Sequence, residues 1–160
     1  ATKIWFPVKP KTKSVLVYMK SGIYHLIIKI PRKKEIQIGR LGVFLFPKGF
    51  YVYTGSAQIN LEKRVTRHLS HEKRNHWHID YLLQYGEITS VFTVEGLKSK
   101  ECVLSNKIAV TLGGKIVADN FGSSDCKCTT HLYFFEHIPK IKDIFRGTER
   151  YKRENSILRG

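Results

Sequence analysis

The sequence has no long apolar segment and few cysteines. Its apolar runs, such as residues 24–30, span only a handful of its 160 residues, whereas a membrane-spanning helix needs about 20. The first eight residues lack the basic-then-apolar layout of a secretory signal. Three cysteines are too few for a disulfide scaffold, so we expect a reducing compartment, the cytoplasm.

Acidic residues are also scarce. The chain has 13 aspartates and glutamates but 28 lysines and arginines, which gives a net charge of +15. A hydrophobic fraction of 42% predicts a packed fold and excludes global disorder. A charge of this size and sign favours nucleic acid as the partner over an anionic membrane surface.

The positive charge is concentrated at the two ends. Residues 1–40 carry +9, residues 41–136 carry +2 and residues 137–160 carry +4. We therefore divide the chain into a basic arm (1–13), a central domain (14–136) and a basic tail (137–160). The ends could be solvated tails, but we favour contact with a phosphate backbone. The residues expected to bind nucleic acid are Lys11, Lys13, Arg32, Lys33, Lys34, Arg67 and Arg74.

Hydrophobic periodicity predicts an α+β fold, with a small mixed or antiparallel sheet flanked by helices. The predicted strands cover residues 14–19, 22–30, 35–40, 42–46, 50–54, 88–95 and 129–135. The predicted helices cover residues 60–70, 76–85 and 99–112, and a weak amphipathic helix follows residue 137.

Two tyrosines lie on neighbouring predicted strands. Tyr24 begins an alternating apolar row, and Tyr53 ends its strand just before Gly55. Two phenol groups at the strand ends could meet a polar ligand. Taken alone, the pair is better explained by ordinary packing of tyrosine in a sheet.

The helix predicted after Tyr53 has a polar flank. Leu61, Val65 and Leu69 form its apolar stripe, and Arg64 and His68 lie four residues apart beside that stripe. The guanidinium of Arg64 could simply cover apolar surface. It could also bind a phosphate, which suits its planar fork.

A carboxylate opens the helix predicted over residues 99–112. Glu101 falls at the end of a stripe formed by Leu104, Ile108 and Leu112. The helix dipole alone favours an acid there. The alternative is a ligand for Mg²⁺, which needs few protein oxygens.

Three motifs in this order are similar to the signature of the GIY-YIG nuclease superfamily. They are Gly22-Ile23-Tyr24, Tyr53-Thr54-Gly55, and Leu61 followed by Arg64 and His68. The runs at residues 76–80 and 121–128 further resemble an archaeal and bacterial branch of unknown function, sometimes fused to DNA glycosylases of the endonuclease III type. The resemblance covers about residues 22–135.

The resemblance implies a one-metal site that hydrolyses phosphodiester bonds. Tyr24 and Tyr53 match the catalytic tyrosines, Arg64 the arginine and His68 a histidine of some branches. Glu101 is the choice for the metal ligand, with Glu95 as the alternative. The two tyrosines are farther apart than is usual in the family, so residues 32–49 are expected to form an inserted hairpin.

A further cluster could bind metal or substrate. Cys126, Cys128 and His131 offer the sulfur and nitrogen ligands of zinc, with His76 and His78 available elsewhere. The Cys-x-Cys spacing is not that of a usual zinc knuckle, and the fourth ligand would have to come from elsewhere in the chain. Free cysteines are therefore favoured over structural zinc. Alternatively, His76, His78, Asp80 and Asp125 line the active cleft.

Taken together, these residues predict a nuclease that requires one Mg²⁺ or Mn²⁺ ion and acts on DNA or RNA. The ion and Arg64 would stabilise charge on the phosphate, and Tyr24 or Tyr53 would orient water. His68 could receive the proton. DNA is favoured, in a repair setting, because of the glycosylase fusions. The competing hypothesis is a nuclease-like fold that only binds nucleic acid.

Overall fold

A computed structural model describes residues 2–5, 21–145 and 151–152 of the chain. The predicted strand at residues 14–19 lies outside these ranges, as do Lys11 and Lys13 of the basic arm. No helix among the described residues is long and apolar enough to span a membrane.

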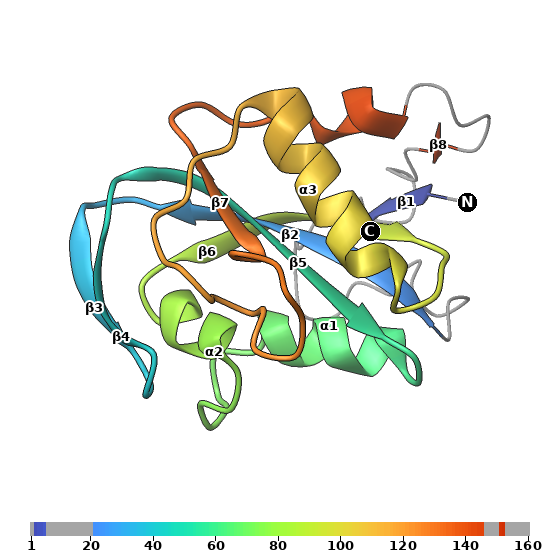
Figure 1. Ribbon diagram of the computed structural model, residues 1–160. Helices are drawn as coiled ribbons and strands as arrows, with labels where there is room; N and C mark the ends of the chain where they lie inside the picture. The colour runs from blue at the N-terminus through green and yellow to red at the C-terminus, as the bar shows by residue number, and fades with distance from the viewer. Residues whose placement is uncertain (1, 6–20, 146–150, 153–160) are drawn as a thin grey trace.

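A six-stranded sheet forms the centre of the fold (Figure 1). Its spatial order is β7-β5-β2-β6-β1-β8, and every neighbouring pair is antiparallel except β1 and β8. The strands are β1 (Thr2–Trp5), β2 (Gly22–Ile30), β5 (Gly49–Ala57), β6 (Glu87–Val94), β7 (Leu132–Phe135) and β8 (Tyr151–Lys152). The predicted α+β class is confirmed. Segments of the two charged ends, β1 and β8, form the last two strands at one side of the sheet, with β8 at its edge.

Strand β2 is apolar on both faces, which explains why it lies inside the sheet. Leu26 and Ile28 belong to one buried cluster, whereas Ile27 belongs to another on the opposite face. Successive side chains of a strand point to opposite faces. Both faces must therefore be covered by other elements.

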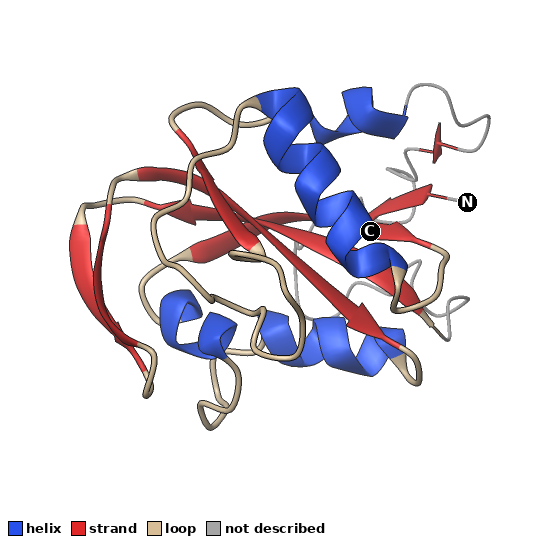
Figure 2. Ribbon diagram, in the orientation of Figure 1, coloured by secondary structure: helices blue, strands red, loops and turns tan. Residues whose placement is uncertain are grey.

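Helices cover the two faces (Figure 2). On one face lie α1 (Leu61–Leu69) and α2 (His78–Leu83), whose Leu61, Val65 and Leu82 join the larger cluster. On the other lie α3 (Lys100–Leu112) and the 3-10 helix η2 (Ile141–Phe145), which contribute to the second cluster. The candidate site residues lie where α1 and α3 approach strand β5.

The inserted hairpin predicted over residues 32–49 is present. It consists of β3 (Lys34–Ile38) and β4 (Gly42–Phe46), which pair with each other in a separate two-stranded sheet. Ile36, Ile38 and Phe46 are buried in the larger cluster. The hairpin thus packs on the domain and leaves the pairing of β2 with β5 continuous.

Three local expectations were wrong. Strand β5 continues to Ala57, because Gly55 pairs with Tyr24 instead of forming a turn. Tyr53 therefore lies inside the strand and not at its end. The buried face of α1 includes His68, while Leu69 is only half-buried. The buried face of α3 is formed by Glu101, Ser105 and Ile108, so the predicted stripe is rotated away from Leu104.

Candidate active site and metal centre

The two tyrosines lie side by side on adjacent strands. Residue 24 of β2 pairs with Gly55, and residue 53 of β5 pairs with Leu26. Both side chains enter the larger buried cluster, and their ring centroids are 6.4 Å apart. Burial raises the pKa of each phenol above its usual value, and the Arg64 charge opposes the shift.

Two glycines allow this close packing. A Cβ built on Gly55 would lie 2.5 Å from the ring of Tyr24, and one built on Gly122 would lie 2.7 Å from the ring of Tyr53. Gly122 also has a φ of +67°, which disfavours other residues. The glycine of the Tyr-Thr-Gly motif is therefore required by the tyrosine on the neighbouring strand.

Replacing Gly55 with alanine is expected to destabilise the protein by about 1–3 kcal/mol, because the ring of Tyr24 must move. Urea unfolding would measure the loss. Gly96→Ala is the matched control, since its Cβ would meet only the flexible side chain of Lys100. Equal stability of the two variants would contradict the proposed packing.

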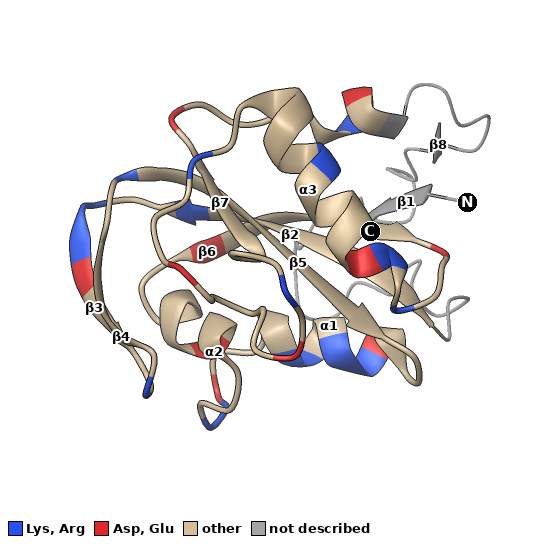
Figure 3. Cartoon of the chain, in the orientation of Figure 1, with Lys and Arg blue, Asp and Glu red and all other residues tan. Residues whose placement is uncertain are grey.

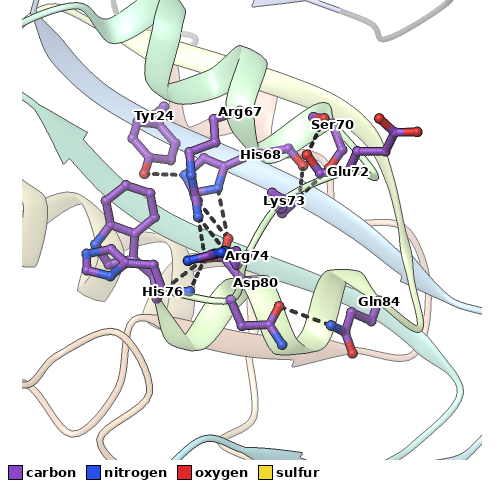
Figure 4. A network of polar contacts seen from close by, with 12 residues as sticks. Tyr24, Arg67, His68, Ser70, Glu72, Lys73, Arg74, His76, Asp80 and Gln84 are labelled. Carbon is purple, nitrogen blue, oxygen red and sulfur yellow. Dashed lines mark hydrogen bonds and ion pairs between the residues drawn. The ribbon is translucent and has the colours of Figure 1, made fainter.

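His68 connects Tyr24 to a buried acid (Figure 4). The hydroxyl of Tyr24 lies 2.8 Å from Nε2 of His68, and Nδ1 of His68 lies 4.0 Å from Oδ1 of Asp80. Burial lowers the pKa of His68 to about 3, so the ring is neutral at pH 7. With its proton on Nδ1, facing Asp80, the ring accepts a hydrogen bond from Tyr24.

Asp80 holds the segment between α1 and α2. Its Oδ2 accepts hydrogen bonds from the backbone N–H groups of His76 and Trp77, and Arg67 donates to both carboxylate oxygens at 3.0 Å. Burial favours the neutral acid, but these hydrogen bonds outweigh it and lower the pKa of Asp80. Arg67 therefore has a partner within the protein, although it was expected to bind nucleic acid.

Arg64 projects from α1 toward the end of β5. It donates a hydrogen bond to the carbonyl of Ser56 at 3.2 Å, and its guanidinium lies 4.5 Å from the ring centroid of Trp77. Arg67 lies on the same ring at 4.4 Å. Arg64 is half-buried and next to Tyr24, so its five N–H donors are held close to the tyrosine pair.

Glu101 reaches the same place from α3. Its side chain is 11% exposed, its Oε2 accepts a hydrogen bond from the hydroxyl of Ser56, and its Oε1 lies 2.8 Å from Nδ1 of His131. The negative charge of Glu101 contributes to the raised pKa of both tyrosines. Ser56 thus joins Glu101 to Arg64. The alternative acid, Glu95, is exposed directly after β6.

The polar runs at residues 76–80 and 121–128 meet each other. The backbone N–H of Gly122 donates to Nδ1 of His78 at 3.0 Å, and burial lowers the pKa of His78. His76 is exposed and packs against Trp77. Asp125 forms an exposed ion pair with Lys98 at 2.7 Å. The contacts of His78 and Asp125 position the loop between α3 and β7.

Three cysteines and one histidine form a cluster that could hold a metal ion. One side-chain ligand atom from each of Cys102, Cys126, Cys128 and His131 lies within 4.8 Å of the others. The sequence indicated the last three but missed Cys102, which is far away in the chain. Burial and hydrogen bonds with the other two thiols raise the pKa of Cys102 to about 12.

Basic residues are spread over the described surface and include residues of α1 and of the start of α3 (Figure 3). Arg32 and Lys33 lie in an exposed turn between β2 and β3. Lys34 begins β3, is also exposed, and lies over the ring of Tyr85. Arg74 is exposed after α1. These residues could bind phosphates, as the sequence predicts.

The fold and site define an α+β domain with a buried tyrosine pair and an adjoining cysteine–histidine cluster. The chain belongs to the family described as domain of unknown function DUF123, whose model matches residues 23–152. No curated protein and no solved structure matches the chain.

Proposed function

We propose that the protein is a divalent-metal-dependent nuclease that hydrolyses phosphodiester bonds. The observation that carries this proposal is that the five predicted residues lie close together, with Ser56 in contact with two of them. Tyr24 and Tyr53 pack together, Tyr24 contacts His68, and Ser56 contacts both Arg64 and Glu101. Tyr24 comes from β2 and Tyr53 from β5, whereas α1 supplies Arg64 and His68, and α3 supplies Glu101.

Each group has a role in the proposed reaction. Arg64 neutralises charge on the phosphate in the transition state, where a guanidinium fork fits two oxygens. Glu101 binds one Mg²⁺ or Mn²⁺ ion, because each of its oxygens keeps a second lone pair beside its present contact. An ion bound there would supply Lewis-acid activation of water and stabilisation of the leaving oxygen. Tyr24 orients that water, and the neutral ring of His68 holds the hydroxyl of Tyr24 in place.

The substrate proposed is DNA, with RNA as the alternative. The net charge of +15 supports a polyanion. The tyrosines are buried, whereas Arg64 and Ser56 are half-buried, which supports an approach of the phosphate from the side of Arg64. The resemblance to domains fused to DNA glycosylases supports DNA repair as the setting.

One observation favours a second function, a module that binds nucleic acid without cleaving it. Both carboxylate oxygens of Glu101 already have partners, Ser56 and His131. If these contacts exclude an ion, the tyrosines and Arg64 would serve packing and phosphate binding only.

Cleavage of labelled single-stranded, duplex and branched DNA, and of RNA, separates the two functions. We expect products with Mg²⁺ or Mn²⁺ and none with EDTA. Glu101→Ala should abolish cleavage while binding survives, and Glu95→Ala should cleave normally. Binding to all substrates without cleavage of any would support the second function, and normal cleavage by Glu101→Ala would reject the ligand assignment.

A further inference from the structure

The cysteine–histidine cluster joins two segments that are distant in the sequence. Cys102 lies in the first turn of α3, and the other three ligands lie in the loop that leads into β7. The imidazole of His131 is buried, and its Nε2 lies 3.6 Å from Sγ of Cys102 and 3.5 Å from Sγ of Cys126.

These separations fit one tetrahedral zinc ion. Zn–S bonds of about 2.3 Å and Zn–N bonds of about 2.0–2.1 Å, at a tetrahedral angle, imply a sulfur–nitrogen separation of roughly 3.6 Å. Three thiolates and one imidazole form a closed structural site. They are also soft ligands, which disfavour Mg²⁺ and Ca²⁺.

The backbone holds His131 in place for such a role. Its N–H donates to the carbonyl of Phe121 at 2.8 Å, and its carbonyl accepts from the N–H of Thr54 at 3.0 Å. Its ring therefore has a fixed position between the sulfurs on one side and Glu101 on the other.

We propose that Cys102, Cys126, Cys128 and Nε2 of His131 bind one structural Zn²⁺ ion, and that the ion positions the carboxylate of Glu101 through His131. A zinc-bound histidine usually directs its other ring nitrogen to a carboxylate or carbonyl. Here Nδ1 lies 2.8 Å from Oε1 of Glu101. Glu101 in turn contacts Ser56, whose carbonyl binds Arg64.

This arrangement gives α3 a second role besides packing. The zinc ion fastens the start of the helix to the loop between α3 and β7, and Glu101 is the residue next to a ligand. Metal loading therefore sets the position of Glu101 beside the tyrosine pair. The zinc site stands on its own ligands, whether or not the protein cleaves nucleic acid.

Metal content of the purified protein tests the site. We expect one zinc per chain by elemental analysis, and Co²⁺ exchanged into the site should show the intense visible bands of a tetrahedral ion and a thiolate charge-transfer band. Cys126→Ser and Cys128→Ser should lose the metal. Asp125→Asn, next to Cys126 but outside the ligand set, should keep it. A full-length protein without metal, or one with octahedral Co²⁺ bands, would overturn the proposal.

A cysteine variant that fails to fold would also lose the metal, so a second variant is needed. His131→Cys keeps a complete ligand set of four sulfur atoms. This variant should retain one zinc and shift the Co²⁺ spectrum to that of an all-sulfur site. An unchanged spectrum would exclude His131 as a ligand.

The link to Glu101 has a separate test. Glu101→Gln should keep one zinc per chain but bind it about 10- to 100-fold more weakly, as measured by competition with a chromophoric chelator. Glu95→Gln is the control and should bind zinc as the wild type does. Equal affinities of all three proteins would refute the coupling while leaving the zinc site intact. None of these measurements uses a nucleic acid, so they are independent of the proposed nuclease activity.

Discussion

Replacing Arg64 with lysine is expected to lower the rate of phosphodiester cleavage by about 10²- to 10³-fold, the usual cost of removing one preorganised donor from a transition state. Lysine keeps the positive charge but not the planar fork that can contact two phosphate oxygens. The guanidinium is held by the carbonyl of Ser56 and the ring of Trp77, so its position is largely fixed before substrate binds.

Single-turnover kinetics at saturating substrate would measure the effect, with binding followed separately by fluorescence anisotropy. Lys63→Ala is the matched control, because Lys63 is exposed on the same helix one position earlier. We expect it to leave the chemical step unchanged. A cleavage rate in Arg64→Lys within a few-fold of the wild type would remove Arg64 from the catalytic role.

The fold was predictable where the apolar pattern is long and unbroken. The bounds expected for β2 and β4 match the structure at both ends, and α3 differs by one residue. Prediction failed where a residue has two structural uses. Gly55 and Ser56 have the composition of a turn, but Gly55 is needed under the ring of Tyr24, so the strand continues.

The candidate site was predictable where its residues are close together in the sequence. The spacing of Arg64 and His68 on one helix is local, so the sequence places them together. The approach of Cys102 to His131 depends on how α3 packs on the sheet, which no local pattern specifies. The role of Asp80 was also missed, because its partners, Arg67 and the backbone at residues 76–77, are brought together only by the turn between α1 and α2.

Lowering the pH from 7 to 5 is expected to cost the protein about 4 kcal/mol of unfolding free energy from two buried histidines. Burial lowers the pKa of both His25 and His68 from 6.5 to about 3. Between these values the unfolded chain binds more protons than the folded one, so stability falls as the pH falls. Each histidine contributes about 2 kcal/mol of the loss at pH 5. Because the folded ring is still neutral at that pH, the size of the loss is set by the pKa of histidine in the unfolded chain.

Urea unfolding at several pH values, with matched substitutions, would assign this loss. His68→Gln places an amide near the position of Nε2, which contacts Tyr24, and His25→Asn does the same for Nδ1, which contacts Thr54. Each variant should lose about 2 kcal/mol less than the wild type between pH 7 and 5, whatever its stability at pH 7. The exposed His71→Gln serves as the control. A wild-type slope in both core variants would show that these rings take up protons between pH 7 and 5 in the folded protein, which would contradict their burial as neutral groups.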